Sequence, residues 1–362
     1  MSRAAAIRLV CKCLAPGRSV DPRELGPGLA TGAALVEAAS THLVAPAMSH
    51  ALREKGLVDF LEPSIVDYFD GVAILNRQRN ARIRTEAIGV ARSLNALGVA
   101  PVLLKGAANL LAGLYPSPAD RMMTDLDVMV PRAALAECVA ALRRQGYVEL
   151  HDNGFPAHHH YPPLGRPGDA ASLELHVEPL DLPYRRLLPA NDIVASAAAW
   201  ELEGARFAVP SPWSRIVHSI AHAELADRDY LLGRLPIRDL LDLALLTNPP
   251  GGIDWALIRQ RFNAIGAGAA LHFHLLAAER LFGLPRNPPT PATTYARILY
   301  RRAIWQADRP GWSLIGERLL RPTHLLSRAL SHPQLRRRLL RSLLDPAWLR
   351  RQWRMLSGKP IA

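Results

Sequence analysis

Residues 102–108 read Val-Leu-Leu-Lys-Gly-Ala-Ala and residues 124–130 read Thr-Asp-Leu-Asp-Val-Met-Val, and these two pieces decide the fold. In the second piece Asp125 and Asp127 occupy positions i and i+2 of a predicted strand, so both carboxylates point to one face of a sheet. Their neighbours Leu126 and Val128 point to the opposite face, into a core. Two carboxylates on one face can share a divalent metal ion.

The first piece contains Lys105 and Gly106, which the sequence places between a strand and a helix. A turn of this kind leaves backbone N–H groups free and puts a lysine beside them, an arrangement suited to a phosphate group. A pair of metal-binding carboxylates and a phosphate-binding turn together predict nucleotide chemistry.

Hydrophobic periodicity extends these pieces into a small sheet with helices on it. We expect strands at 99–104, 124–130, 147–150 and 172–177 and helices at 107–114 and 131–145. A proline-rich loop at 116–120 and a hairpin excursion at 151–170 would lie near the site.

Both flanks of this unit are predicted to be helical. Before it, one helix is expected through residues 65–75 and a second one through 88–97. After it, helices are expected at 213–226, 236–247 and 268–282, with Asp254 as the N-cap of a further helix. The predicted fold class is α+β.

A third carboxylate is typical of sites that hold two metal ions. The best candidate is Glu174 in Leu173-Glu174-Leu175-His176, because strand alternation places Glu174 and His176 on one face. If this strand lies beside the Asp125 strand, three carboxylates converge.

Composition excludes several classes of protein. The chain has 362 residues, of which 49% are hydrophobic, so it can bury a sizeable core. It has no run of about 18 apolar residues, and no transmembrane helix is expected. Its three cysteines form neither an even disulfide framework nor a zinc set, which favours a reducing, cytoplasmic compartment.

The positive charge is concentrated near the C-terminus. Residues 301–362 contain thirteen Arg and one Lys against three acidic residues, so they carry +11 of the net charge of +12. Leucines and tryptophans alternate with these arginines at 335–353, a basic amphipathic pattern. An anionic membrane surface, packing on the body of the protein and nucleic acid remain open as partners of this tail. Peripheral contact at the inner membrane surface is therefore one expectation.

Taken together, the motifs resemble the polymerase-β-like nucleotidyltransferase superfamily, and within it a broad bacterial group of uncharacterised nucleotidyltransferases. That group has a Leu-Lys-Gly strand end, an arginine before Asp-x-Asp, and a later Glu-x-His strand. The residues that match are Leu104-Lys105-Gly106, Arg121 with Asp125-Leu126-Asp127, and Glu174-Leu175-His176. The resemblance covers roughly residues 70–290, and its helical part includes His218, His222, residues 238–243 and Ile253-Asp254-Trp255.

The resemblance implies a minimal nucleotidyltransferase core, a small mixed sheet with helices, followed by an α-helical domain on the other side of a cleft. We expect a helical region at 1–84, the core at 85–182, the helical domain at 183–290 and the basic tail at 291–362. The implied enzyme moves a nucleoside monophosphate from a nucleoside triphosphate such as ATP to an acceptor hydroxyl and releases pyrophosphate. The acceptor would be a small molecule, a peptide or a tRNA.

The resemblance also assigns residues to roles. Mg²⁺ or Mn²⁺ would be held by the catalytic carboxylates Asp125, Asp127 and Glu174, with Glu174 as third ligand or as base. The nucleotide would be bound by Lys105, Gly106, Ala107, Arg121 and His176. Ala107 departs from the superfamily pattern, in which a serine hydroxyl or a second glycine is usual. Two rival functions stay open: a toxin-like modifier of tRNA or protein, and a catalytically degenerate nucleotide-binding or scaffold protein.

Several residues allow two interpretations. Arg121 either binds the triphosphate or pairs with Asp125. His176 either acts in the site, which its position on the same face as Glu174 favours, or is a structural strand histidine with its hydrogen bonds made within the fold. Three consecutive histidines on a strand would point in different directions, which favours a solvated or substrate-gating loop over a zinc site for His158, His159 and His160. His218 and His222, one helical turn apart, are expected in packing of the core or site wall rather than in half a zinc site. Asp239 and Asp242 either act in the site or form polar ties to His222 or Arg238.

Overall fold

The computed structural model describes residues 1–26, 28–152, 158–247, 252–284, 293–309, 311–312, 330, 333–346 and 349–350. Among these residues a mixed seven-stranded sheet has the order β3-β4-β5-β2-β1-β7-β6. The strands are β1 (Val102–Leu103), β2 (Asp125–Met129), β3 (Val148–Glu149), β4 (Leu164–Gly165), β5 (Ser172–His176), β6 (Ala198–Leu202) and β7 (Ala205–Val209). The fold is α+β, as predicted.

The two strands that carry the acidic motifs are direct neighbours. β2 and β5 pair in parallel, with Asp127 opposite Glu174 and Asp125 opposite Ser172. The two acidic strands are therefore neighbours, which was the condition for their carboxylates to come together. On its other edge β2 pairs antiparallel with β1. β1 is shorter than the predicted strand at 99–104 because Pro101 has no N–H group with which to extend the ladder.

Three strands were not predicted: β4, which lies in the expected hairpin excursion at 151–170, and β6 and β7. β6 and β7 form a hairpin whose turn residues Glu203 and Gly204 both have positive φ, 52° and 72°. Turns of this kind match the twist of the flanking strands. β7 also pairs in parallel with β1. The sheet thus continues into 198–209, a segment that the expected division placed in the helical domain at 183–290.

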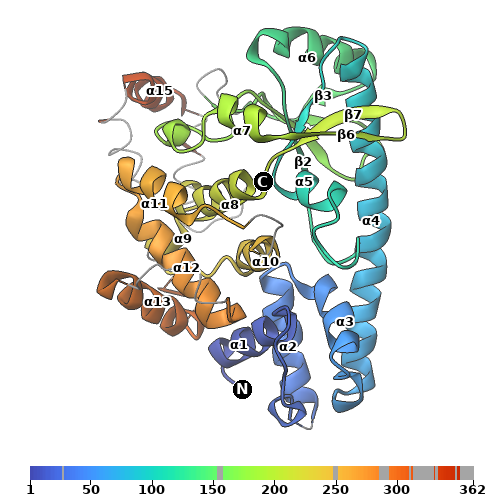
Figure 1. Cartoon of the computed structure of the whole chain (residues 1–362), viewed down its shortest axis with the longest axis vertical. Helices are drawn as coiled ribbons and strands as arrows, with labels where there is room; N and C mark the ends of the chain where they lie inside the picture. Colours follow the sequence, from blue (N-terminus) through green and yellow to red (C-terminus); the bar gives the residue numbers. More distant parts are fainter. Residues whose placement is uncertain are drawn as a thin grey trace.

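Some of the helices pack against the sheet, and the others form a separate bundle (Figure 1). Those of the first half are α1 (Arg3–Leu14), α2 (Leu29–Thr41), α3 (Ala45–Glu54), α4 (Pro63–Asn95), α5 (Lys105–Leu111) and α6 (Leu135–Arg144). Those of the second half are α7 (Ala190–Ser196), α8 (Pro212–Ile220), α9 (Asp229–Leu232), α10 (Ile237–Leu246), α11 (Trp255–Ala264), α12 (Gly268–Phe282), α13 (Thr294–Ala307) and α15 (Pro333–Leu343). Residues 221–226 form a π-helix after α8. The Asp254 side chain accepts a hydrogen bond from the Leu257 N–H group and caps α11, as expected.

α4 is one continuous helix of 33 residues, not the two helices that the sequence predicted. It runs from the N-terminal helices to the sheet along one side of the molecule (Figure 1). Its middle turns carry the buried asparagines Asn76 and Asn80, which interrupt the apolar pattern. Their amides donate hydrogen bonds to the carbonyl oxygens of Ala119, Pro118 and Arg121. The proline-rich loop before β2 is therefore fixed against α4.

Two hydrophobic cores hold the described residues together. One core joins the sheet to α5, α6 and the second half of α4, through side chains such as Ile83, Leu126, Leu175 and Phe207. The other core joins α1, α2 and α3 to the helices of the C-terminal half, through side chains such as Leu9, Met48, Leu240 and Phe273. The helices α1 to α3 consequently pack with helices of the C-terminal half, up to α13, as one helical body.

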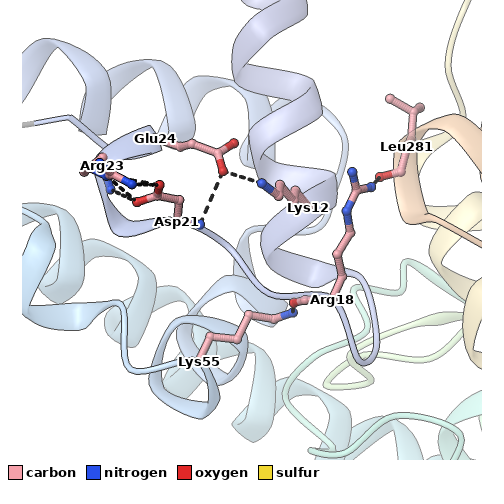
Figure 2. Close-up of polar contacts among 7 residues, drawn as sticks. All are labelled: Lys12, Arg18, Asp21, Arg23, Glu24, Lys55 and Leu281. Carbon is pink, nitrogen blue, oxygen red and sulfur yellow. Dashed lines mark hydrogen bonds and ion pairs between the residues drawn. The ribbon is translucent and has the colours of Figure 1, made fainter.

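One polar contact links the N-terminal segment to α12, and others hold that segment in place (Figure 2). The Arg18 guanidinium donates to the carbonyl oxygen of Leu281 in α12 at 3.5 Å. Lys55, at the end of α3, donates to the carbonyl oxygen of Arg18 at 2.5 Å. Asp21 and Glu24 form a capping box, and Glu24 also pairs with Lys12.

The segment that the sequence assigned to a basic tail divides into two parts. α13 packs on α12 and buries Leu299 and Ala303, so residues 294–307 belong to the helical body. α15 exposes Leu340 and Leu343 together with Arg336 and Arg337. Other parts of the predicted tail, including Trp348 and Trp353, lie outside the described residues. No helix in the described ranges is long and apolar enough to cross a membrane.

Candidate functional site

The acidic residues of β2 and β5 meet the lysine of α5 at the centre of the sheet. Asp127 Oδ1 accepts hydrogen bonds from Lys105 Nζ at 2.7 Å and from His176 Nε2 at 2.8 Å. Glu174 Oε2 lies 3.5 Å from His176 Nε2. One ligand atom from each of Asp127, Glu174 and His176 lies within 4.8 Å of the other two. The structure therefore brings together four of the residues that the sequence selected.

Asp125 lies two residues before Asp127 and is half-buried. It stands outside the compact group of Asp127, Glu174 and His176 and instead lines the adjacent cavity. Burial and the charge of Asp127 raise the pKa of the Asp125 carboxyl. Three carboxylates thus face one small region, and Asp125 is the one whose negative charge is least compensated.

The charges at this centre depend on one another. Burial by itself would raise the pKa of Asp127, but Lys105 and His176 hold it well below its usual range. Burial would likewise lower the pKa of Lys105, but Asp127, Glu174 and Asp125 raise it. The pKa of His176 is raised despite its burial, because Asp127 and Glu174 accept its hydrogen bonds. A lysine and an imidazole therefore neutralise part of the acidic cluster.

The Lys105 backbone is strained. Its φ of 45° is in the left-handed region, which residues with a side chain adopt at an energetic cost. Lys105 is the first residue of α5, so the predicted turn is in fact the first turn of the helix. This conformation carries the ammonium group towards Asp127, and backbone strain of this kind is concentrated at functional sites.

A cavity of about 70 Å³ lies beside the acidic centre. Its walls come from α5, the start of β2, α8 with the following π-helix, and α10. The polar lining residues include Lys105, Asn109, Arg121, Asp125, Arg215, His218, Ser219, His222, Arg238, Asp239 and Asp242. Arg238 and Asp239 also line a larger cavity of about 650 Å³ between α2, α10 and α13. The two cavities therefore share a wall.

The small cavity is rich in cations and in polar atoms without a protein partner. Burial lowers the pKa of Arg215 to about 10, and its guanidinium donates to the neutral Asn109 Oδ1 at 2.6 Å. Within the described ranges His218 Nε2, Ser219 Oγ and Arg238 Nε are buried without a hydrogen-bond partner. Buried polar groups normally have partners. These atoms indicate a site for a polar, anionic ligand.

Arg121 pairs with Asp242 and not with Asp125. Its guanidinium binds both carboxylate oxygens of Asp242 in α10, with Nη2 to Oδ2 at 2.6 Å and Nε to Oδ1 at 3.0 Å. Tyr115 donates to the same carboxylate at 2.5 Å. The expected pair with Asp125 is not formed. Arg121 lines the cavity, but its main contact joins the loop before β2 to the helical body.

Gly106 and Ala107 differ in their relation to the site. A Cβ atom on Gly106 would lie 2.6 Å from Arg121 Nη1 and 3.0 Å from Met123 Cγ, so only glycine fits here. The Ala107 methyl is fully buried in the core beneath the sheet. The Ala107 side chain therefore points away from the cavity, and the position usual for a serine hydroxyl is not on its wall.

The sequence of the chain matches one described protein family. The sequence profile of a family described as uncharacterised nucleotidyltransferase matches residues 31–283. The chain belongs to this family. The uncharacterised nucleotidyltransferase match spans the sheet with both acidic strands, and its range of residues 31–283 includes every residue that lines the small cavity.

A solved structure is also similar to the chain. It is an antigenic nucleotidyltransferase-like protein from Paracoccidioides brasiliensis, 17% identical, matched over 56% of this chain and 97% of that chain with a TM-score of 0.35. No curated protein matches the sequence.

Sequence reasoning missed Asn109, Arg215 and Ser219. Asn109 lies one helical turn after Lys105, on the same face of α5, and this spacing is a usable signal. Arg215 and Ser219 have the same i, i+4 relation in the sequence around α8. Nothing in the sequence shows that α8 packs beside α5, so neither could be assigned to the site before the fold was known.

Proposed function

We propose that this family member is a metal-dependent nucleotidyltransferase that moves a nucleoside monophosphate from a nucleoside triphosphate to an acceptor hydroxyl and releases pyrophosphate. The observation that carries the proposal is the closeness of Asp127 and Glu174 on two adjacent parallel strands, beside a cationic cavity that Asp125 lines. Membership of the family supports a transferase of this class.

The donor atoms fit Mg²⁺ or Mn²⁺. Asp125, Asp127 and Glu174 offer carboxylate oxygens, the ligands that hard divalent cations prefer. Burial, and after it the charges of Asp127 and Glu174, raise the pKa of Asp125, and a bound cation would lower it. When bound, the metal would neutralise phosphate charge and lower the pKa of an attacking hydroxyl.

The residues of the cavity support binding of the triphosphate. Lys105, Arg215 and Arg238 place three cations around its walls, and lysine and arginine are the usual side-chain partners of phosphate oxygens. Glu174 is half-buried beside the carboxylate pair and is the candidate base for the acceptor proton. The cavity of about 650 Å³ has room for one of the two organic groups, nucleoside or acceptor, that a transfer reaction brings together.

Transfer of label tests this proposal. The chain is incubated with Mg²⁺, a cell extract and triphosphates labelled at the α or the γ phosphate. We expect label from the α position, but not from the γ position, to appear on an acceptor, and we expect Asp125→Asn to abolish it. Asp59→Asn, at an exposed carboxylate outside the site, is the matched control. Label transferred from the γ phosphate, or full activity of Asp125→Asn, would refute the proposal.

We also propose peripheral contact with anionic membranes through α15. Its exposed Arg336 and Arg337 lie on the same short helix as exposed Leu340 and Leu343. Helices that combine basic and apolar side chains in this way bind at membrane interfaces.

A further inference from the structure

One face of α8 supplies hydrogen-bonding side chains to the small cavity. Arg215, His218 and Ser219 all line this cavity. They occupy positions i, i+3 and i+4 of the helix, a spacing that places side chains on one helical face. α8 packs against α5, and Lys105 and Asn109 of α5 line the same cavity. The carboxylates of the sheet and the polar face of α8 therefore belong to different walls of one cavity.

His218 is the most deeply buried of the three side chains. It is 3% exposed, and within the described ranges its Nε2 atom has no hydrogen-bond partner. The neighbouring Ser219 Oγ is also buried without a partner among these residues. Buried polar atoms are normally paired with protein or water, and both of these groups can donate a hydrogen bond. Their place on one wall indicates an occupant that accepts hydrogen bonds.

Arg215 adds a positive charge to the same wall. Its guanidinium donates to Asn109 Oδ1 from Nε at 3.1 Å and from Nη2 at 2.6 Å. The amide oxygen orients the guanidinium but carries no negative charge that would neutralise it. No carboxylate forms an ion pair with Arg215 in the part of the chain that the structure describes. The occupant of the cavity is therefore expected to be an anion.

The size of the cavity selects the kind of anion. Its volume is about 70 Å³, whereas pockets for drug-sized organic ligands measure roughly 300 to 1,000 Å³. A nucleoside is too large for this space. Phosphate groups are small and negatively charged, and their oxygen atoms accept hydrogen bonds from arginine and from neutral donors.

We propose that Arg215, His218 and Ser219 form a pyrophosphate site, which binds the β and γ phosphates of the triphosphate. This proposal rests on the proposed function, in which the α phosphate lies at the carboxylates of β2 and β5. The remaining two phosphates would then extend towards α8. Inorganic pyrophosphate carries the same groups, so it should bind to this site by itself, without a divalent metal.

The pyrophosphate site gives His218 a role in the transfer step. As the acceptor oxygen bonds to the α phosphorus, the bond from that phosphorus to the bridging oxygen of the β phosphate breaks. The electron pair of this bond goes to the leaving pyrophosphate, and the acceptor proton goes to the base, for which Glu174 is the candidate. His218 donates a hydrogen bond from Nε2 to the pyrophosphate and keeps its proton. A fixed donor aimed at developing negative charge accelerates such a step.

Calorimetric titration of the full chain with inorganic pyrophosphate, in the absence of divalent metal, tests the site. We expect Arg215→Met and His218→Leu each to weaken pyrophosphate binding at least tenfold, because each variant loses a hydrogen bond to a charged group. His218→Gln retains an N–H donor and should recover most of the lost affinity. Arg206→Met, at an exposed arginine of β7, is the matched control and should bind like the natural chain.

Three results of this titration would overturn the pyrophosphate site. They are the absence of binding to the natural chain, unchanged affinity in Arg215→Met and His218→Leu, and an equal loss in Arg206→Met. Circular dichroism checks that each variant is folded. If either of the larger substitutions unfolds the chain, Ser219→Ala decides, because it removes only a hydroxyl group. We expect Ser219→Ala to weaken binding at least twofold, and unchanged affinity would again overturn the site.

The rate of label transfer tests the role of His218 in the reaction. With the α-labelled triphosphate, His218→Leu should lower kcat at least tenfold, and His218→Gln should restore most of it. An undiminished kcat in His218→Leu, or an equal loss in both variants, would contradict a hydrogen bond to the leaving group. If the natural chain transfers no label, the proposed function fails, while the titration still decides whether α8 binds pyrophosphate.

Discussion

The buried pair of Arg121 and Asp242 predicts a large loss of stability when one partner is removed. The two side chains are 6% and 3% exposed, and Asp242 also accepts the hydroxyl of Tyr115. Asp242→Ala leaves a guanidinium and a phenol buried without their acceptor. Breaking a buried pair in this way costs about 3 to 5 kcal/mol, a large part of the roughly 5 to 15 kcal/mol that stabilises a typical domain.

Urea unfolding followed by circular dichroism measures this loss. The double variant Arg121→Met with Asp242→Leu should recover most of the stability, because no uncompensated charge remains. Glu37→Ala, which breaks an exposed pair with Arg3, is the control and should cost less than about 1 kcal/mol. If Asp242→Ala costs no more than Glu37→Ala, the pair is not structural and Arg121 is available for phosphate.

Three further predictions concern the site, the helical body and the tail. Lys105→Met should weaken triphosphate binding at least tenfold in calorimetry, since a cation near phosphate is lost; unchanged affinity would make Lys105 structural. Burial, with Glu224 and Asp227 nearby, raises the pKa of Asp229 to about 8. Between about pH 4 and pH 8 the unfolded chain releases this proton while the folded chain keeps it, so stability falls as pH rises, by up to about 1.4 kcal/mol per pH unit. In urea unfolding, Asp229→Asn should show a flatter decline over this window than the natural chain, and parallel curves would contradict the burial of that carboxyl. Substitution of Arg336 and Arg337 by glutamate should reduce sedimentation with phosphatidylserine vesicles, and the binding of the natural chain should weaken as salt rises; equal binding of variant and natural chain would exclude α15 as the membrane contact.

The acidic strands could be predicted because their pattern is local. Alternation placed Asp125 with Asp127, and Glu174 with His176, on shared faces, and the parallel pairing of β2 and β5 then joined the two faces. Strand alternation alone fixes which side chains share a face. Alternation does not show which strands are neighbours, and the adjacency of β2 and β5 is seen only in the structure.

Other features depend on contacts between distant segments. α4 was interrupted in the prediction because Asn76 and Asn80 stand at core positions, where they hold the loop before β2. The exposed side chains of β6 hid an edge strand from any pattern of burial. The pair of Arg121 with Asp242 was not predicted because Asp242 lies 121 residues away. Tertiary contacts override local pattern at each of these positions.

Binding of a triphosphate with and without Mg²⁺ tests the central claim most directly. A nonhydrolysable triphosphate is titrated into the natural chain and into Asp125→Asn by calorimetry. The account predicts that Mg²⁺ strengthens binding to the natural chain at least tenfold and that Asp125→Asn loses this gain while keeping its fold. Equal affinity with and without Mg²⁺, or an undiminished gain in Asp125→Asn, would contradict the assignment of these carboxylates to a metal-bound nucleotide.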